Sequence, residues 1–337
     1  MSLILPEGLP AIGQLRKEGV GLDIVERRTD ARRTDEADGQ GVGADVKEVG
    51  VDVKDVRADV KEVGVDGKEV RADVGTLRIA ILNLMPTKET TEEDFLRILA
   101  NSPLRVEVEF MKVKSHVSRH VSPEHMERFY RDFEVMKDED FDGLIVTGAP
   151  LEHLEYEQVD YWEELGEIFS WARARMRSTL YICWAAQAGL YYHYGIKKYP
   201  LPAKMFGIFP QKNLAPRCPL FRGFDDVFHM PHSRHTELHH EDIAGNPELR
   251  IIAESDESGV GIVYAREGRE VFVTGHSEYR PGTLDSEYRR DLAKGLPIAM
   301  PKHYYEDDDP SKAPVVTWRA HGNLMINNWL AFLVNRE

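Results

Sequence analysis

From residue 76 onward, short apolar runs alternate with longer amphipathic stretches, and this alternation constrains the fold more than any other feature of the chain. Apolar runs of this kind are typical of strands buried on both faces, as in parallel sheets covered by helices. We expect strands at 77–84, 104–111, 141–148, 179–183, 249–255, 259–265 and 270–276, and helices at about 91–100, 122–136 and 160–177. The sequence thus predicts a three-layer α/β fold with a mostly parallel sheet, whose sites gather at the carboxyl ends of the strands.

Composition limits the kinds of partner that the chain can have. Its 337 residues are 42% hydrophobic, enough for a sizeable core, and carry a formal net charge of −15. This charge opposes binding to nucleic acid or to an anionic membrane surface. Cys183 and Cys218 form no CxxC pair and no zinc-type spacing with histidine, so we expect neither a disulfide framework nor a metal. Without a signal peptide or a membrane-spanning run, a cytoplasmic location is the default expectation.

A repeat with a period of 14 residues precedes the α/β region. The segment ADVKEVGVD occurs at 44–52 and again at 58–66. The three-four spacing of its valines would suit a helical seam, whereas Gly50 and Gly64 would each cost a helix about 1 kcal/mol relative to alanine. A flexible charged insertion and a short helix both remain open, and the composition favours the insertion.

Cys183 lies where the apolar run TLYIC (179–183) meets the small-residue run WAAQAG (184–189). A strand that turned sharply into a helix here would expose the thiol above the sheet, and the helix N-terminus would favour the thiolate. A lone buried cysteine is more often an inert part of the core. The turn by itself therefore only suggests a nucleophile.

A second apolar run, VFVTGHSEY (271–279), ends with His276 and Glu278. Alternation along an extended chain places both side chains on the same side. Beside Cys183, His276 could accept the thiol proton while Glu278 orients the imidazole, as in other nucleophile–base–carboxylate triads. The pair alone could equally belong to a solvated loop, but the turn and the pair together favour an enzyme.

This combination resembles the class I glutamine amidotransferase-like superfamily, and longer segments narrow the resemblance to the homoserine O-acyltransferase family of the MetA type. These segments are RIAILNLMPTKETTE (78–92), TGAPLEHLEYEQVDYW (147–162), CWAAQAGLYYHYGIKK (183–198), MPHSRHTE (230–237) and VTGHSEY (273–279). The resemblance covers about residues 3–30 and 75–335. This sequence departs slightly from the family pattern at Ala185, where glycine is more usual, and strongly in the repeat. The resemblance implies an N-terminal arm (1–30), an insertion (31–74) and a catalytic acyltransferase domain (75–337).

The family resemblance implies transfer of an acyl group from acyl-coenzyme A to the γ-hydroxyl of homoserine, in methionine biosynthesis. Cys183 would carry the acyl group as a thioester, His276 would act as general base and acid, and Glu278 would orient it. Backbone N–H groups of Leu151 and Trp184 would form the oxyanion hole. A homodimer is implied as well, and no cofactor beyond the acyl-CoA co-substrate.

The same resemblance assigns the homoserine contacts. Arg290 would bind the substrate carboxylate, because a guanidinium group pairs well with a carboxylate. Lys204 and Ser233 would make further contacts with homoserine. Lys88, in MPTKE, would lie near the catalytic centre. For the coenzyme A phosphates, the densest basic stretch near Cys183 comprises Lys197, Lys198, Lys204 and Lys212.

Glu152 indicates the acyl donor. The resemblance implies that glycine at this position accompanies succinyl transfer and glutamate accompanies acetyl transfer. A succinyl carboxylate about 5 Å from Glu152 would be repelled by about 3 kcal/mol at an effective dielectric near 20, or about two orders of magnitude in rate. We therefore expect acetyl-CoA as donor, with succinyl-CoA as the alternative, unless Glu152 is only a solvated loop acid.

Two other kinds of protein remain compatible with the sequence. A glutamine amidotransferase or cysteine hydrolase of the same superfamily would keep the triad, although such proteins generally lack the MPTKETTE and MPHSRHTE segments. A non-catalytic interaction protein would use the valine repeat as an oligomerisation seam. The complete set of Cys183, His276 and Glu278 argues against the second alternative.

Overall fold

The computed structural model describes residues 3–25, 75–115 and 121–334. The described parts of 1–26 and 75–337 form one compact unit. The repeat lies outside the described residues, and the expectation of an insertion at 31–74 with it. The division into arm, insertion and catalytic domain therefore stays a prediction.

A twelve-stranded sheet forms the centre of this unit. Its strands are β1 (Leu3–Pro6), β2 (Leu22–Val25), β3 (Leu77–Leu82), β4 (Val106–Lys112), β5 (Tyr130–Asp132), β6 (Gly143–Val146), β7 (Ser178–Ile182), β8 (Tyr199–Asn213), β9 (Val227–Glu237), β10 (Leu249–Ser255), β11 (Gly259–Ala265) and β12 (Glu270–Val273). Their spatial order is β2-β1-β4-β3-β6-β7-β12-β11-β10-β8-β9, and β5 pairs with β4. The pairings from β2 to β12 are parallel, and those from β12 to β9 are antiparallel.

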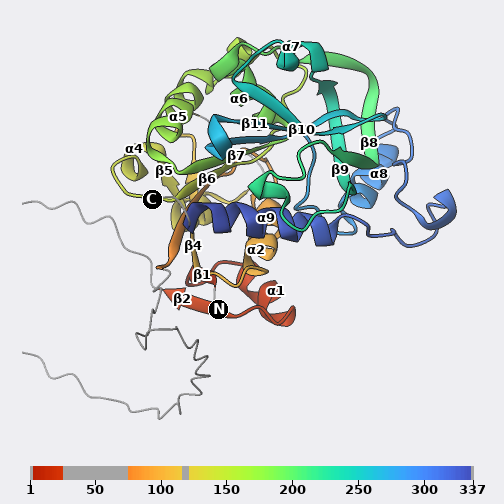
Figure 1. Cartoon of the computed structure of the whole chain (residues 1–337). Coiled ribbons are helices and arrows are strands. Elements are labelled where there is room, and N and C mark those ends of the chain that lie inside the picture. The colour runs from red at the N-terminus through yellow and green to blue at the C-terminus, as the bar shows by residue number, and fades with distance from the viewer. Residues whose placement is uncertain (1–2, 26–74, 116–120, 335–337) are drawn as a thin grey trace, which may run out of the picture. The chain divides into compact units, whose positions relative to one another are not determined.

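Helices cover both faces of the sheet (Figure 1). They are α1 (Ala11–Lys17), α2 (Lys88–Ala100), α3 (Pro123–Phe129), α4 (Phe133–Met136), α5 (Trp162–Arg175), α6 (Trp184–Tyr194), α7 (His240–Ala244), α8 (Thr283–Ala293) and α9 (Arg319–Val334). Helices α1, α2 and α9 contribute to one apolar core, whereas α4, α5 and α6 contribute to a second. The three-layer, mostly parallel α/β architecture expected from the sequence is confirmed.

Successive residues of the central strands enter opposite cores. On β3, Ile79 and Ile81 belong to the core that α2 and α9 complete, whereas Ala80 and Leu82 belong to the core of α5 and α6. All four side chains are fully buried. Burial on both faces explains why these strands read as continuous apolar runs.

One expected helix is wrong. The interval 122–136 is not a single helix, because the chain is extended at β5 between α3 and α4. β5 pairs in parallel with β4, with Tyr130 opposite Phe110, and the Tyr130 side chain is 2% exposed. Strand pairing and burial of this tyrosine thus outweigh the helical pattern of the flanking residues.

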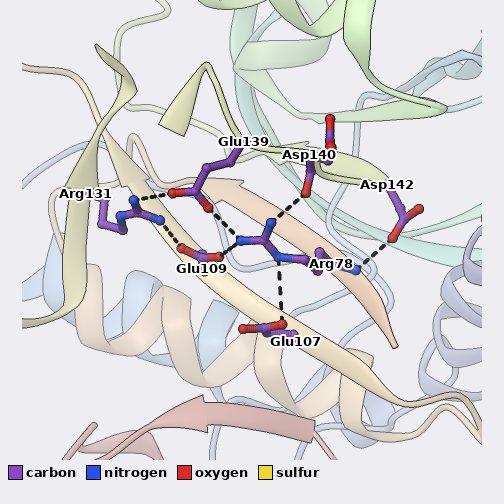
Figure 2. Close-up of polar contacts among 7 residues, drawn as sticks. All are labelled: Arg78, Glu107, Glu109, Arg131, Glu139, Asp140 and Asp142. Carbon is purple, nitrogen blue, oxygen red and sulfur yellow. Dashed lines mark hydrogen bonds and ion pairs between the residues drawn. The ribbon is translucent and has the colours of Figure 1, made fainter. Parts of the chain in front are cut away.

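An ion-pair network ties β3, β4 and β5 to the chain that follows α4 (Figure 2). Arg78 of β3 and Arg131 of β5 both bond to Glu109 of β4 and to Glu139. Burial opposes ionisation of Glu139, but bonds to the two arginines hold its pKa below the ordinary value. The network is a charge-based link between three strands and a loop.

A membrane-crossing helix is not found in the described part of the chain, because no helix there combines sufficient length with sufficient apolar character.

Candidate active site

A single residue makes the turn from β7 to α6. β7 ends at Ile182 and α6 begins at Trp184, so Cys183 alone connects them. Its φ of 52° and ψ of −114° lie in a region that non-glycine residues rarely adopt, and such strained residues cluster at functional sites. The sharp strand-to-helix turn expected at Cys183 is present.

β12 brings His276 to the same end of the sheet. β12 pairs in parallel with β7, and Val273 lies opposite Ile182, so both chains leave the sheet at the same end. His276 Nδ1 lies 2.7 Å from Glu278 Oε1. The side chains of His276 and Glu278 are 6% and 7% exposed, so the pair is largely shielded from water.

Gly148, in the loop GAPLE (148–152), lies next to both Cys183 and His276. A Cβ added at Gly148 would lie 3.4 Å from Cβ of Cys183 and 3.6 Å from Cε1 of His276. The two side chains therefore share one small neighbourhood at the GAPLE loop. A side chain at position 148 would occupy the space beside them.

The charges around His276 favour its protonated form. Burial alone would lower its pKa, but charge and hydrogen bonding from Cys183 and Glu278 outweigh burial and raise the pKa well above 6.5. The imidazolium form of His276 is therefore favoured, with the Cys183 sulfur and the Glu278 carboxylate beside it. Such a cysteine–histidine pair provides both a nucleophile and a proton for a leaving group.

The two expected oxyanion donors differ in their surroundings. Trp184 is the first residue of α6, and N–H groups in a first helical turn have no acceptor within their helix. The N–H of Leu151 donates to the Ala149 carbonyl at 2.9 Å, so it would have to leave that acceptor to bind an oxyanion. Trp184 therefore suits the expected role better than Leu151, and both assignments stay predictions.

The residues expected to bind homoserine lie around two carboxylates of α8. Lys204 Nζ lies 3.0 Å from Glu287 Oε2, and Ser233 Oγ donates to the same oxygen at 2.6 Å. Arg290 forms a two-pronged pair with Asp291 at 2.7 and 3.0 Å. Lys204 Nζ is 3.9 Å from Asp291, which joins all three expected contacts into one charged cluster.

Tyr279 links this cluster to His276. Its ring stacks on the His276 ring with centroids 4.1 Å apart, and its hydroxyl donates to Glu287 Oε1 at 3.4 Å. Sequence reasoning missed Glu287 and Tyr279. Glu287 lies one helical turn before Arg290, and this i, i+3 spacing is the signal that could have indicated it.

The structure does not gather the four lysines expected to bind coenzyme A. Lys198 donates to the carbonyls of Glu152 and Leu154. Lys212 pairs with Asp256 at 2.7 Å, eight residues along β8 from Lys204, which is about 26 Å in a strand. Lys197 is exposed. Lys212 therefore lies apart from Lys204, and a role for these lysines in binding the coenzyme A phosphates stays a prediction.

Lys88 lies in a buried polar cluster at the start of α2. Its Nζ donates to the Asn83 carbonyl and lies 5.7 Å from the centroid of the Tyr130 ring. Burial lowers the pKa of Lys88 to about 8, and the charge of Glu92 offsets part of this shift. These contacts tie α2 to β3 and β5, and a role for Lys88 in the reaction stays a prediction.

A buried arginine was also missed. Arg234, 2% exposed, donates to the carbonyls of Thr236 and Ser258. Thr236 Oγ1 donates to Gln187 Oε1 at 2.7 Å, and Gln187 lies in the first turn of α6. Arg234 thereby helps to fix β9 against the helix that follows Cys183. The motif MPHSRHTE contains this residue, but nothing in the sequence distinguishes a buried arginine from a solvated one.

The described residues contain no group of three or more His, Cys, Asp or Glu side chains placed to hold a metal ion.

The mostly parallel α/β sheet, with Cys183 at a strand-to-helix turn and His276 and Glu278 nearby, has a glutamine amidotransferase-like fold. A solved glutamine amidotransferase of Methylobacillus flagellatus shares this fold at 14% identity and a TM-score of 0.50, covering 78% of this chain and 96% of its own. At that identity the likeness concerns the fold alone.

Sequence relatives narrow the class. The family model described as homoserine O-succinyltransferase matches residues 60–337. A homoserine O-acetyltransferase of Bacteroides fragilis is 61% identical over 261 residues, covering 77% of this chain and 86% of the relative. One from Brevibacillus brevis is 58% identical over 261 residues, covering 77% and 85%. The chain belongs to the homoserine O-succinyltransferase family, and it is an acyltransferase.

Proposed function

We propose that this chain transfers an acetyl group from acetyl-CoA to the γ-hydroxyl of L-homoserine, through a thioester on Cys183, in methionine biosynthesis. Family membership supports the acyl transfer and the amino-acid acceptor. The observation that carries the choice of acetyl is Glu152, in the loop that leads away from Gly148 beside the thiol. The curated relatives are named for the same donor.

In the first half-reaction, the Cys183 thiolate attacks the carbonyl carbon of acetyl-CoA. The tetrahedral intermediate collapses as the C–S bond to coenzyme A breaks. The leaving thiolate takes the proton of the His276 imidazolium and departs as free coenzyme A. The raised pKa of His276 supports this starting state, because the imidazolium holds a proton for the leaving group.

In the second half-reaction, neutral His276 accepts the proton of the homoserine hydroxyl as its oxygen attacks the thioester. The bond to Cys183 breaks, and the thiolate and the imidazolium are restored together. Glu278 stabilises the charged ring through its bond to Nδ1 at 2.7 Å. Two half-reactions that share one covalent intermediate predict ping-pong kinetics.

Homoserine carries one carboxylate and one ammonium, and the α8 cluster offers groups for both. Arg290 and Lys204 suit the carboxylate, whereas Glu287 suits the ammonium. Each of these side chains is ion-paired in the structure, so substrate binding would exchange internal pairs for substrate contacts. Tyr279 stacks between this cluster and His276, which supports an acceptor hydroxyl close to the catalytic base.

We retain a homodimer and a cytoplasmic location as parts of this proposal. A reducing compartment suits a reaction that needs a free thiol at Cys183, and both cysteines are free in the structure. Light scattering after size exclusion would measure the mass of the assembly, and a monomer would contradict the homodimer.

The mass of the intact protein after brief exposure to acetyl-CoA tests the nucleophile. We expect an acetyl adduct on the parent and on Cys218→Ala, and none on Cys183→Ala, whose turnover should fall by several orders of magnitude. Survival of the adduct in Cys183→Ala would refute the thioester assignment. Incubation with glutamine is a control, because ammonia release would favour an amidotransferase instead.

Replacement of Glu152 tests the donor. Glu152→Gly removes the carboxylate that would repel a succinyl group, so the ratio of kcat/KM for acetyl-CoA to that for succinyl-CoA should fall by about two orders of magnitude. The matched control is Glu248→Gly, which removes an exposed carboxylate from a different loop, the one before β10. Equal rates with both donors in the parent, or an unchanged ratio in Glu152→Gly, would remove Glu152 from the selectivity.

A further inference from the structure

Lys198 is bonded to the loop that carries Glu152. Its Nζ donates to the Glu152 carbonyl at 2.9 Å and also to the Leu154 carbonyl. The same ammonium lies 4.6 Å from the centroid of the Tyr156 ring, within the range of a cation–π contact. One side chain, which precedes β8, thus contacts three alternate residues of a segment more than forty positions earlier.

Tyr156 connects this segment to the helix that follows the nucleophile. Its ring is buried, stacks on Tyr191 of α6 at 4.6 Å, and lies 6.0 Å from the ring of Trp184. Trp184 is the residue next to Cys183. The position of the loop relative to the nucleophile is therefore held through Tyr156 at one end.

Few buried side chains hold the stretch between Glu152 and Tyr156, where the His153 ring lies 4.8 Å from the His235 ring and the Leu154 N–H donates to the Leu151 carbonyl at 3.1 Å. The side chains of His153, Leu154 and Glu155 are exposed, and Glu152 is only partly buried. The hydrogen bonds from Lys198 reach the two carbonyls of this exposed stretch from a different part of the chain. These bonds restrain the backbone of the loop at Glu152 and at Leu154.

We propose that Lys198 is a positioning residue for the choice of acyl donor: it holds the 151–156 loop so that the Glu152 carboxylate faces the acyl group on Cys183. The inference rests on the proposed function, since it concerns how Glu152 exerts its effect. Repulsion between two carboxylates weakens with distance, so a loop free to move would let Glu152 turn away from a succinyl group. A small acetyl group would be affected much less.

Three single variants test this role, with kcat/KM measured for acetyl-CoA and for succinyl-CoA. Lys198→Met keeps much of the side-chain length without the donors, and we expect it to lower the acetyl-to-succinyl ratio about tenfold. Lys198→Arg keeps donors for both carbonyls and should stay within about threefold of the parent ratio. Lys312→Met, an exposed lysine paired with Asp307, is the matched control and should leave the ratio unchanged.

A double variant separates positioning from a direct charge effect. If Lys198 acts through Glu152, adding Lys198→Met to Glu152→Gly should leave the ratio of Glu152→Gly unchanged. A further change of ratio in the double variant would mean that the ammonium acts directly on the donor, and would overturn the proposal.

The single variants also distinguish this inference from the proposed function. Where the parent prefers acetyl-CoA and Glu152→Gly loses that preference, an unchanged ratio in Lys198→Met, or an equal loss with both donors, overturns the role of Lys198 alone. A parent without donor preference overturns the proposed donor, and the role of Lys198 with it.

Discussion

His193 is the residue from which we expect a distinct loss of stability in acid. It lies on α6, and the Tyr181 hydroxyl is 3.2 Å from its Nε2. Burial, opposed by the charge of Glu270 and helped by the charges of Arg173 and Arg266, lowers the pKa of His193 to about 4. In the unfolded chain the same group titrates near 6.5.

The sign of the pH effect follows from proton binding. Between pH 6.5 and 4 the folded state binds fewer protons at His193 than the unfolded state. The contribution of His193 to the free energy of unfolding is therefore complete above pH 6.5 and is lost as the pH falls towards 4. The full effect is about 3 kcal/mol in the free energy of unfolding. His193→Gln should lack this contribution, and its difference from the parent in urea unfolding should change across that window.

An exposed histidine provides the control for this measurement. His240 is 50% exposed and pairs with Glu254 at 2.8 Å, so His240→Gln should follow the parent closely. Parallel curves for the parent and His193→Gln between pH 7.5 and 4.5 would show that His193 does not have the shifted pKa.

At the candidate active site, the sequence indicates residues whose geometry is local. Cys183 is indicated by the change from an apolar run to a small-residue run, and His276 and Glu278 by their spacing after a strand. Glu287 has one local signal, its i, i+3 spacing from Arg290, but its contact with Ser233 and the contacts of Arg234 depend on partners far away in the chain. Ser233 meets Glu287 across 54 positions, and Arg234 reaches Ser258 across 24.

At the scale of elements, the network of Figure 2 should stabilise β5 through Arg131. The Arg131 side chain is 14% exposed and bonds to Glu109 and Glu139 at 2.5 Å each. Arg131→Met would leave two partly buried carboxylates with fewer partners, and we expect a loss of about 2 kcal/mol in the free energy of unfolding. Chemical denaturation at low and high salt measures this cost, which added salt should reduce.

Arg175 offers a matched comparison. It pairs with Asp140 at 3.5 Å, with side chains 52% and 101% exposed, so Arg175→Met should change stability by less than about 0.5 kcal/mol. Equal costs for the two variants would mean that the shared, partly buried geometry of the network adds nothing beyond an ordinary surface pair.

Helices and strands were predictable where the burial of their own side chains sets the pattern of apolar residues. The apolar runs identify the parallel strands, because both faces of those strands are covered. β8 and β9 were not expected, since β8 contains Pro200, Pro202 and Pro210 and pairs with β9 only across a long connection. α9 contains Gly322, which reads as a helix breaker, yet an added Cβ there would lie 2.8 Å from the Ser277 carbonyl oxygen. Contact with a distant loop, which the sequence does not display, explains this glycine.

At the scale of the whole molecule, the order of strands sets what the connection before β3 must span. β2 and β3 are separated by β1 and β4 in the sheet, and all four strands are parallel. The chain must therefore return from the carboxyl end of β2 to the amino end of β3 while crossing three strand spacings. That is about 14 Å across the sheet and about 20 Å along it.

Removal of residues 44–71 would leave 23 residues between Val25 and Leu77. Fully extended, that connection could reach about 75 Å, well beyond the span that the sheet requires. We therefore expect the deletion to keep the parent's free energy of unfolding and to leave turnover within about threefold. A variant with 44–71 replaced by a glycine–serine linker of equal length separates the effect of length from that of sequence. If either variant loses turnover together with its oligomeric state, the repeat supports assembly and the interaction-protein alternative gains weight. If folding is lost in both variants, the repeat packs against the catalytic unit.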